Sequence, residues 1–174
     1  MVGPTVERFD DRAAALALRA RRSPAISRAM YTLSMLGDDG RVWIVAAAVE
    51  AVRDGRSTAR FTHGVAWLGV ESVVVNLAIK KVAHRPRPDG ITEHEHRLRI
   101  PKDTSFPSGH AASAATMAVI LSEGSPLAPL WTGLALAIGA SRVHVGVHHG
   151  SDVVAGWLIG AAFGVAARRT RRTR

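Results

Sequence analysis

The chain of 174 residues is strongly basic, with 23 Lys and Arg residues against 14 Asp and Glu residues and a formal net charge of +9. This length suits a single domain, and the absence of cysteine excludes disulfides, thiolate catalysis and cysteine-based zinc sites. Hydrophobic residues make up 47% of the chain, an ordinary share for a soluble protein. The charged residues lie in blocks, however, and the segments between the blocks are apolar and rich in Ala, Gly, Val and Leu.

The first predicted element is an amphipathic helix within residues 1–23. Apolar side chains recur there at helical spacing, separated by Arg and Asp: Val6, Phe9, Ala13, Leu16 and Ala20. A helix of this kind can lie on a membrane surface, although a helix that packs on a soluble domain would show the same pattern. The chain does not open on a basic segment followed by an apolar one, so a cleaved signal peptide is not expected.

Residues 24–167 are predicted to form a membrane domain. A helix over Ala25–Leu36 and a turn at residues 37–40 precede five apolar segments: Arg41–Val52, Phe61–Ile79, Ala111–Leu121, Leu127–Ala140 and Val153–Ala167. The expected fold class is all-α, an integral-membrane bundle of about six helices, five or six of them spanning. Fifteen helical residues extend about 22 Å, less than a hydrocarbon core of about 30 Å. The segments must therefore include flanking residues or thin the bilayer, and a soluble helical core also fits on length alone.

Two patterns favour the membrane interpretation. Gly156, Gly160 and Gly164 recur every four residues, and small residues at this spacing let helices pack closely in lipid. If the segments alternate in direction, and provided that Ala25–Leu36 also crosses, the arginines of residues 19–22 and 53–60 lie on the same side as the tail. The positive-inside rule makes this side the cytoplasm. We therefore expect a multi-pass plasma-membrane protein with both termini in the cytoplasm.

Residues 168–174, RRTRRTR, are predicted to be a basic cytoplasmic tail. Such a run can bind nucleic acid, but beside an apolar helix it is more typical of an anchor to anionic lipid. The expected partner of the tail is therefore the bilayer, and no nucleic acid partner is expected.

Three polar clusters fall on the outer, extracytoplasmic side of this topology. Lys80, Arg87 and Arg142 place cations where positive charge is normally depleted, and guanidinium groups match the oxygens of a phosphate. Ser108 and Gly109 stand where a helix begins, so backbone N–H groups and the positive end of the helix dipole also favour an anion. Together these residues predict a phosphate-binding site.

Two histidines make this binding site a candidate catalytic site. One neutral imidazole can attack phosphorus while a second protonates the departing alkoxide, and the candidates are His110 and His148. Asp152 follows His148 by four residues, so on a helix its carboxylate can hold one ring nitrogen and leave the other free to attack. No metal or other cofactor is expected, because the cations supply the charge stabilisation that a metal would give.

The order and spacing of these clusters resemble the signature of the type 2 phosphatidic acid phosphatase superfamily. The signature is Lys, six residues and Arg-Pro; then Pro-Ser-Gly-His; then Ser-Arg, five residues, His, three residues and Asp. It matches residues 80–88, 107–110 and 141–152. The resemblance covers about residues 37–167.

This resemblance implies a function for each matched residue. His148 would carry a phosphohistidine, Asp152 would orient it, and His110 would act first as acid and then as base. Phosphate binding would fall to the remaining residues: Lys80, Arg87, Ser108, Gly109 and Arg142. The resemblance also implies independence from metal and a site that opens to the outside.

Other polar residues are expected to have different roles. His149 is predicted to be structural, and His84 and Arg85 are predicted to face solvent. Residues 93–96, EHEH, superficially suggest a metal site but are more typical of a solvated lid. Glu71 lies in a membrane segment, where an ionisable residue is either functional or bonded to a neighbouring helix, and the sequence favours neither.

The leading hypothesis is a phosphatase that acts on a phosphomonoester or diphosphate of a membrane lipid. The short, Ala- and Arg-rich chain is similar to bacterial polyprenyl-phosphate phosphatases, with decaprenylphosphoryl-phosphoribose as one candidate substrate. Phosphatidate, phosphatidylglycerophosphate and undecaprenyl diphosphate stay open, because the motifs recognise only the phosphate. Vanadium haloperoxidases share the signature but are soluble and much longer. A protein that only binds anionic lipid would need no histidines.

Overall fold

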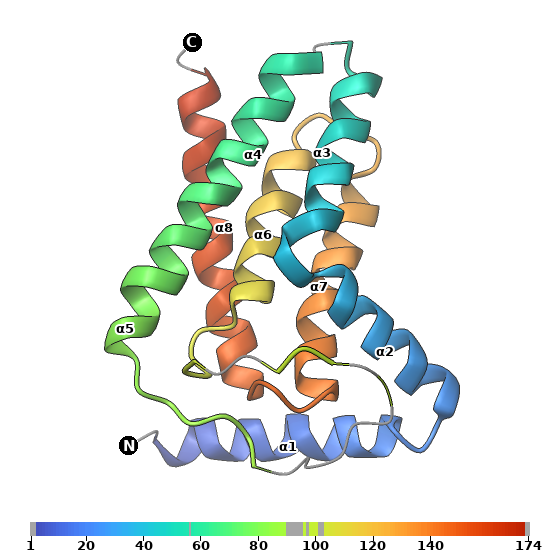
Figure 1. The fold of residues 1–174 in the computed structure, drawn as a ribbon, viewed down its shortest axis with the longest axis vertical. Helices are drawn as coiled ribbons and strands as arrows, with labels where there is room; N and C mark the ends of the chain where they lie inside the picture. The colour runs from blue at the N-terminus through green and yellow to red at the C-terminus, as the bar shows by residue number, and fades with distance from the viewer. Residues whose placement is uncertain (1–2, 56, 90–95, 97, 101–102, 173–174) are drawn as a thin grey trace.

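The computed structural model describes residues 3–55, 57–89, 96, 98–100 and 103–172, and every regular element in these ranges is a helix (Figure 1). In chain order the elements are α1 (Pro4–Ala20), α2 (Pro24–Leu36), the 3-10 helix η1 (Asp38–Gly40), α3 (Arg41–Arg53), α4 (Ser57–Val73), the π-helical segment η2 (Val74–Ile79), α5 (Lys80–Val82), α6 (Gly109–Leu121), α7 (Ala128–His144) and α8 (Gly150–Arg172). The predicted all-α class is confirmed.

Helix α6 forms the centre of the bundle and packs mainly against α8 and α7 (Figure 1). A Cβ atom on Gly160 of α8 would lie only 2.0 Å from the carbonyl oxygen of Ala112, so no larger residue fits there. The predicted role of the glycines in close helix packing is confirmed. Helix α6 itself is rich in buried alanines: Ala111, Ala112, Ala114, Ala115 and Ala118.

The predicted turn at residues 37–40 is confirmed and directs the chain back into the bundle. Asp39 and Gly40 have positive φ angles of 55° and 68°, a backbone conformation that favours glycine and that Asp tolerates. The reversal separates α2 from α3 and brings Asp38 beside the first turn of α6.

Helices α1 and α2 differ from the predicted topology. Figure 1 shows α1 lying across the lower end of the bundle, roughly perpendicular to the other helices. Helix α2 starts beside the end of α7, where the Ser27 hydroxyl is 3.2 Å from Nε2 of His144. It ends at Gly37, which packs against His110 at the start of α6. Because α2 begins and ends near the same end of the bundle, it does not carry the chain across.

The prediction that both termini share one side depends on Ala25–Leu36 crossing the bundle, and the structure does not show such a crossing. The N-terminus lies at the lower end in Figure 1 and the C-terminus at the upper end. Arg21 belongs to the lower end, because its Nε donates a 2.6 Å hydrogen bond to the carbonyl oxygen of His144. Its charge therefore does not join those of the C-terminal arginines.

Helix α8 continues through Arg172, so the first five residues of the predicted tail are helical. Arg171 forms an ion pair of 3.0 Å with Glu123, which follows α6. Among the described residues, α8 is also the one helix that is long and apolar enough to cross a bilayer unaided. The 13 residues of α6 extend only about 20 Å.

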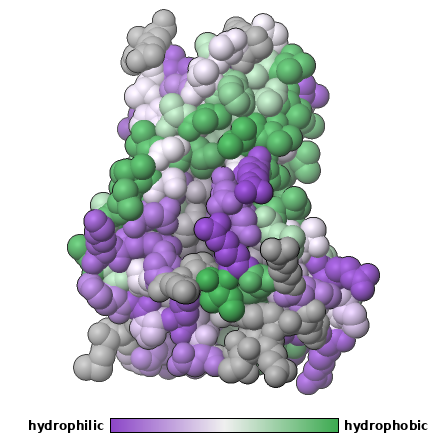
Figure 2. Space-filling view, in the orientation of Figure 1, coloured by the Kyte–Doolittle hydropathy of each residue, from purple (hydrophilic) through white to green (hydrophobic). Residues whose placement is uncertain are grey.

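The surface of the bundle is divided by polarity. Figure 2 shows apolar side chains over much of its upper part and hydrophilic side chains gathered toward the lower end. Exposed apolar residues of α3 contribute to the upper part: Val45, Val49 and Val52. This division suits a bundle whose apolar part is embedded in a bilayer.

Candidate active site

A cavity of about 800 Å³ lies where α6 begins, near the lower end of the bundle. Four of the predicted site residues line it: Lys80, Gly109, His110 and His148. The other four lie directly behind or beside these: Arg87, Ser108, Arg142 and Asp152. Residues from three separate motifs thus converge on one space.

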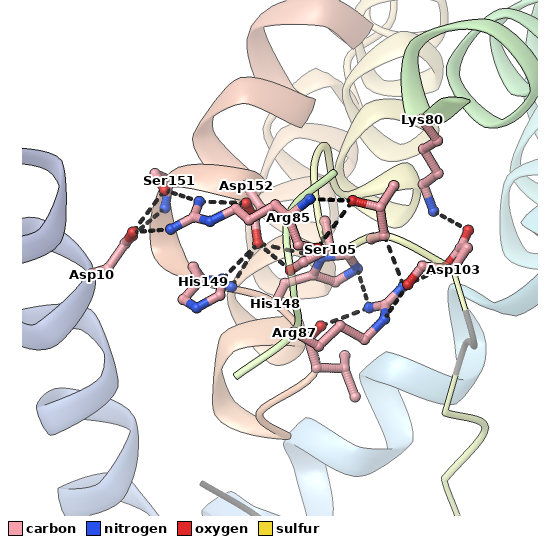
Figure 3. Close-up of polar contacts among 12 residues, drawn as sticks. Asp10, Lys80, Arg85, Arg87, Asp103, Ser105, His148, His149, Ser151 and Asp152 are labelled. Carbon is pink, nitrogen blue, oxygen red and sulfur yellow. Dashed lines mark hydrogen bonds and ion pairs between the residues drawn. The ribbon is translucent and has the colours of Figure 1, made fainter. Parts of the chain in front are cut away.

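The first motif supplies two cations that are held by one carboxylate. Lys80, at the start of α5, places Nζ 2.7 Å from Oδ2 of Asp103, and Arg87 places Nη2 2.5 Å from Oδ1 of the same residue (Figure 3). Burial by itself would raise the pKa of Asp103, but the bonds and charges of Lys80 and Arg87 lower it below its ordinary value. Asp103 therefore stays ionised and fixes both cations at the cavity. Nothing in the spacing of the motifs marks Asp103.

The second motif presents polar groups at the start of α6. Ser108 is the N-cap residue of α6, and its backbone N–H donates a 3.0 Å hydrogen bond to the carbonyl oxygen of Asp152. The Ser108 hydroxyl is buried and has no hydrogen-bond partner among the described residues. Gly109 lines the cavity without a side chain, so an anion can approach the helix start closely.

Arg142, in the last turn of α7, is a fully buried cation with little compensation. Its Nη1 bonds to the hydroxyl of Ser34 on α2. Its Nε and Nη2 have no partner within the part of the chain that the structure describes. A buried guanidinium without an acceptor is costly, and an anion at this position would satisfy it.

His148 follows α7 and has a defined tautomer. Its Nδ1 lies 2.7 Å from the carbonyl oxygen of Ser105. A carbonyl can only accept, so Nδ1 carries the proton and Nε2 keeps its lone pair. Nε2 lies 3.4 Å from Nη1 of Arg87, and His148 lines the cavity. The unprotonated nitrogen is therefore next to a cation that is predicted to bind phosphate, as a nucleophile requires.

The imidazole of His148 is held in its neutral form. Burial is the largest cause, and the positive charges of Arg142 and Arg87 act in the same direction, while Asp152 opposes them. Together they lower the pKa of His148 from 6.5 to about 4. The imidazole therefore stays neutral at pH values where an exposed histidine would be protonated.

We expect the His148 imidazole to titrate with a midpoint near pH 4 and to stay neutral between pH 5 and 6.5. ¹⁵N NMR of histidine-labelled protein would measure this midpoint, with the signal assigned by its loss in His148→Gln. Direct observation separates this titration from the second ionisation of a phosphate substrate, which has a pKa of about 6. A midpoint at 6.5 or above would contradict the described environment.

Asp152 is placed differently from the prediction that it holds the histidine ring directly. Its Oδ2 is 3.8 Å from Nδ1 of His148, beyond hydrogen-bond distance. Oδ2 instead accepts from the Ser105 hydroxyl and from the backbone N–H of His149 at 2.8 Å. Asp152 therefore acts on His148 through Ser105, whose carbonyl contacts the ring.

The prediction that Arg85 faces solvent is wrong. Only 16% of its side chain is exposed, and its Nη1 forms a 2.6 Å ion pair with Oδ1 of Asp152 (Figure 3). Its Nη2 forms a second pair, also 2.6 Å, with Asp10 of α1. These partners are 67 and 75 residues away in the sequence, so local spacing could not reveal them. His84, by contrast, is exposed as predicted.

His110 has a carboxylate partner that the motifs do not include. Its Nε2 lies 2.9 Å from Oδ1 of Asp38 in η1. Burial by itself would raise the pKa of Asp38, but the hydrogen bond to His110 and the charges of His110, Arg142 and Arg99 lower it. Asp38 is therefore an anion that can stabilise a protonated His110.

Glu71 belongs to the contact between two helices rather than to the cavity. It is fully buried on α4, and its Oε2 accepts a 2.7 Å hydrogen bond from the hydroxyl of Ser113 on α6.

The described residues include no cluster that could hold a metal ion. The predicted lid residues 93–95 lie outside the described ranges.

Comparisons with known proteins identify the family of the chain. A family model described as the PAP2 superfamily matches residues 63–174. The chain is 31% identical over 132 residues to the decaprenylphosphoryl-5-phosphoribose phosphatase of Mycobacterium tuberculosis. The alignment covers 76% of this chain and 73% of that protein. This chain is also 39% identical over 95 residues to the undecaprenyl-diphosphatase of Sulfolobus acidocaldarius. That alignment covers 53% of this chain but only 46% of the relative. The fold is similar to a transmembrane PAP2-type phosphatidylglycerolphosphate phosphatase from Bacillus subtilis, with a TM-score of 0.76 and 22% identity over 98% of this chain and 88% of that one.

The fold is that of a transmembrane phosphatase, and the relatives are named phosphatases. The chain is therefore a phosphatase. The chain belongs to the PAP2 superfamily. The matched region contains all eight predicted site residues, whereas α1, α2 and α3 precede it.

Proposed function

We propose that this protein is a metal-independent phosphatase of a polyprenyl-linked membrane lipid, with His148 as nucleophile. The observation that carries the proposal is the tautomer of His148, whose Nδ1 is fixed by the Ser105 carbonyl while Nε2 lies beside Arg87 at the cavity. A protein that only binds anionic lipid has no need for such an arrangement, because cations alone would hold the phosphate.

The reaction proceeds in two steps that share one phosphate site. Nε2 of His148 attacks phosphorus, the ester P–O bond breaks, and His110 gives its proton to the departing alkoxide. Water then attacks the phosphohistidine, His110 removes a proton from it, and inorganic phosphate leaves while His148 regains its neutral ring. Charge on the transferring group is stabilised by these residues: Lys80, Arg87, Ser108, Gly109 and Arg142.

Replacement of Asp38 by Asn tests the role of His110. We expect kcat/KM for an alkyl phosphate to fall about 10- to 100-fold, because the protonated imidazole loses its anionic partner. The loss should be smaller for p-nitrophenyl phosphate, whose leaving group needs less help from an acid. Steady-state kinetics with both substrates would measure the difference.

Asp39→Asn is the matched control for Asp38→Asn. Asp39 also lines the cavity, but its carboxylate is 47% exposed and pairs with Arg41 and Arg99 rather than with a predicted site residue, and Asn tolerates its positive φ. Because exposed ion pairs contribute little, activity should stay within about 2-fold of the wild type. Equal losses on the two substrates in Asp38→Asn would contradict an acid role for His110.

The substrate is proposed from the relatives as well as from the site. The mycobacterial relative is named for decaprenylphosphoryl-5-phosphoribose, and the archaeal relative for undecaprenyl diphosphate. The cavity of about 800 Å³ can take a phosphate together with a polar group attached to it. Decaprenylphosphoryl-phosphoribose is therefore the first candidate, ahead of phosphatidate, phosphatidylglycerophosphate and undecaprenyl diphosphate.

Phosphate release from these four lipids, measured with chelator present, tests the assignment. We expect activity without added metal and the highest kcat/KM for the polyprenyl-linked phosphomonoester. A preference for phosphatidate or phosphatidylglycerophosphate would overturn the substrate, and no hydrolysis of any lipid would favour the binding-only alternative.

For the orientation, we propose that the site opens on the extracytoplasmic side and that the C-terminal arginines lie in the cytoplasm. The support is the charge at the far end of the bundle, where Arg168, Arg169 and Arg171 continue α8. Helix α1 then lies on the outer surface, with Phe9, Leu16 and Leu18 exposed to the interface of the bilayer.

A further inference from the structure

A continuous chain of polar contacts joins α1 to His148 (Figure 3). Asp10 of α1 pairs with Arg85 at 2.6 Å, and the same guanidinium pairs with Asp152 at 2.6 Å. Asp152 accepts from the hydroxyl of Ser105, and the Ser105 carbonyl accepts from Nδ1 of His148 at 2.7 Å. Each member thus contacts the next, from a surface helix to the proposed nucleophile.

Asp10 is also the point at which α1 is fixed to the bundle. Its side chain is only 7% exposed, whereas most of α1 is exposed. Oδ1 accepts from the backbone N–H of Ser151 at 2.7 Å, and Oδ2 accepts from the Ser151 hydroxyl at 2.9 Å. Gly150 allows this approach, because a Cβ atom there would lie 2.9 Å from Cβ of Ala13.

The geometry of Arg85 makes it a link and not merely a counter-ion. Its planar guanidinium presents Nη1 to Asp152 and Nη2 to Asp10, so both carboxylates determine its orientation. Without Asp10, Arg85 would keep only one anionic partner and could rotate. Asp152, which is fully buried, would then lose a fixed donor to Oδ1, while Oδ2 keeps its bonds from Ser105 and from the His149 backbone.

We propose that Asp10 and Arg85 are positioning residues for His148, so that α1 forms part of the catalytic apparatus. This inference rests on the proposed role of His148 as nucleophile. Arg85 holds Asp152, Asp152 holds Ser105, and the Ser105 carbonyl sets the ring of His148. A displacement of about 1 Å at a nucleophile can cost about 100-fold in rate, so loss of Asp10 should slow the chemical step without weakening substrate binding.

The test uses full-length protein in detergent with p-nitrophenyl phosphate as the probe. In Asp10→Asn we expect kcat to fall about 10-fold or more with KM changed less than about 2-fold. Asp11→Asn is the matched control, because Asp11 is the next residue on the same helix and is exposed; it should match the wild type. The double variant Asp10→Asn/Arg85→Gln should lose no more activity than Arg85→Gln alone, because the two residues act in series.

Rapid-quench measurement of phosphohistidine separates misplacement from misfolding. We expect Asp10→Asn to form phosphohistidine with a lower rate constant in a single turnover with excess enzyme, and its peak level should fall as well because hydrolysis is unchanged. A smaller amount formed at the wild-type rate would overturn the inference, because it would show only a loss of folded protein. Multiplicative losses in the double variant would overturn it as well. If the wild type forms no phosphohistidine, the proposed function fails. If the wild type forms phosphohistidine and Asp10→Asn forms it at the same rate, this inference alone fails.

Discussion

Replacement of His148 by Ala is expected to abolish phosphatase activity, with kcat/KM lower by at least about 10⁴-fold. The variant lacks Nε2 of His148, the ring nitrogen that lies beside Arg87 at the cavity. The cations and the start of α6 remain, so the variant should still bind phosphate. Phosphate release from a lipid phosphate, together with binding of inorganic vanadate or phosphate, would measure the two properties separately.

His84→Ala is the control for this prediction. His84 is exposed and lies in the first motif, so its loss should leave activity within about 2-fold of the wild type. His148→Gln, which keeps more of the buried volume, should be as inactive as His148→Ala. Full activity in either His148 variant would contradict the proposed mechanism, because it would mean that His148 is not the nucleophile.

The second large effect is expected at Arg142. Arg142→Met should lower kcat/KM by about 10²- to 10³-fold, because a preorganised donor to the transferring phosphate is lost. Its folding should not suffer, because Nε and Nη2 of this buried cation have no protein partner among the described residues and Met fills a similar volume without a charge. Kinetics and the thermal unfolding midpoint of the same preparation would measure both effects. Arg142→Lys should recover only part of the activity, because the ammonium lacks the guanidinium fork.

Arg60→Met provides the opposite pattern as a control. Arg60 is also buried, but it pairs with Asp54 at 2.7 Å and bonds to the carbonyl oxygen of Glu123 at 2.9 Å, near the far end of the bundle. Its loss should lower the unfolding midpoint and leave the turnover of folded protein unchanged. If Arg142→Met instead loses stability and keeps its turnover, Arg142 is a structural residue and not a phosphate ligand.

Much of the candidate site could be predicted from the sequence because its motifs lie at the ends of helices. The boundaries of α6, α7 and α8 follow from apolar segments and small residues, and these boundaries place Ser108, Arg142 and His148 at one end of the bundle. Charge type then indicates a phosphate, since three cations on the side where positive charge is normally depleted favour an anionic ligand.

The partners of these residues could not be predicted, because they come from distant parts of the chain. Asp38 and Asp103 hold members of the site, and Asp10 holds Arg85 behind it, yet none has a fixed spacing to the residue it contacts. The path of α2 was mispredicted for a related reason. Its apolar pattern is typical of a membrane helix, but its contacts with His144 and His110 hold both of its ends near the site.

The most direct test of the central claim is chemical identification of the covalent intermediate. The protein would be mixed with a ³²P-labelled lipid phosphate, quenched in alkali within milliseconds, digested and analysed by mass spectrometry under alkaline conditions. We predict label on the peptide that contains His148, stable in alkali, lost in acid and absent from His148→Ala. Label on another residue, or complete hydrolysis without any labelled protein, would contradict a phosphohistidine at His148.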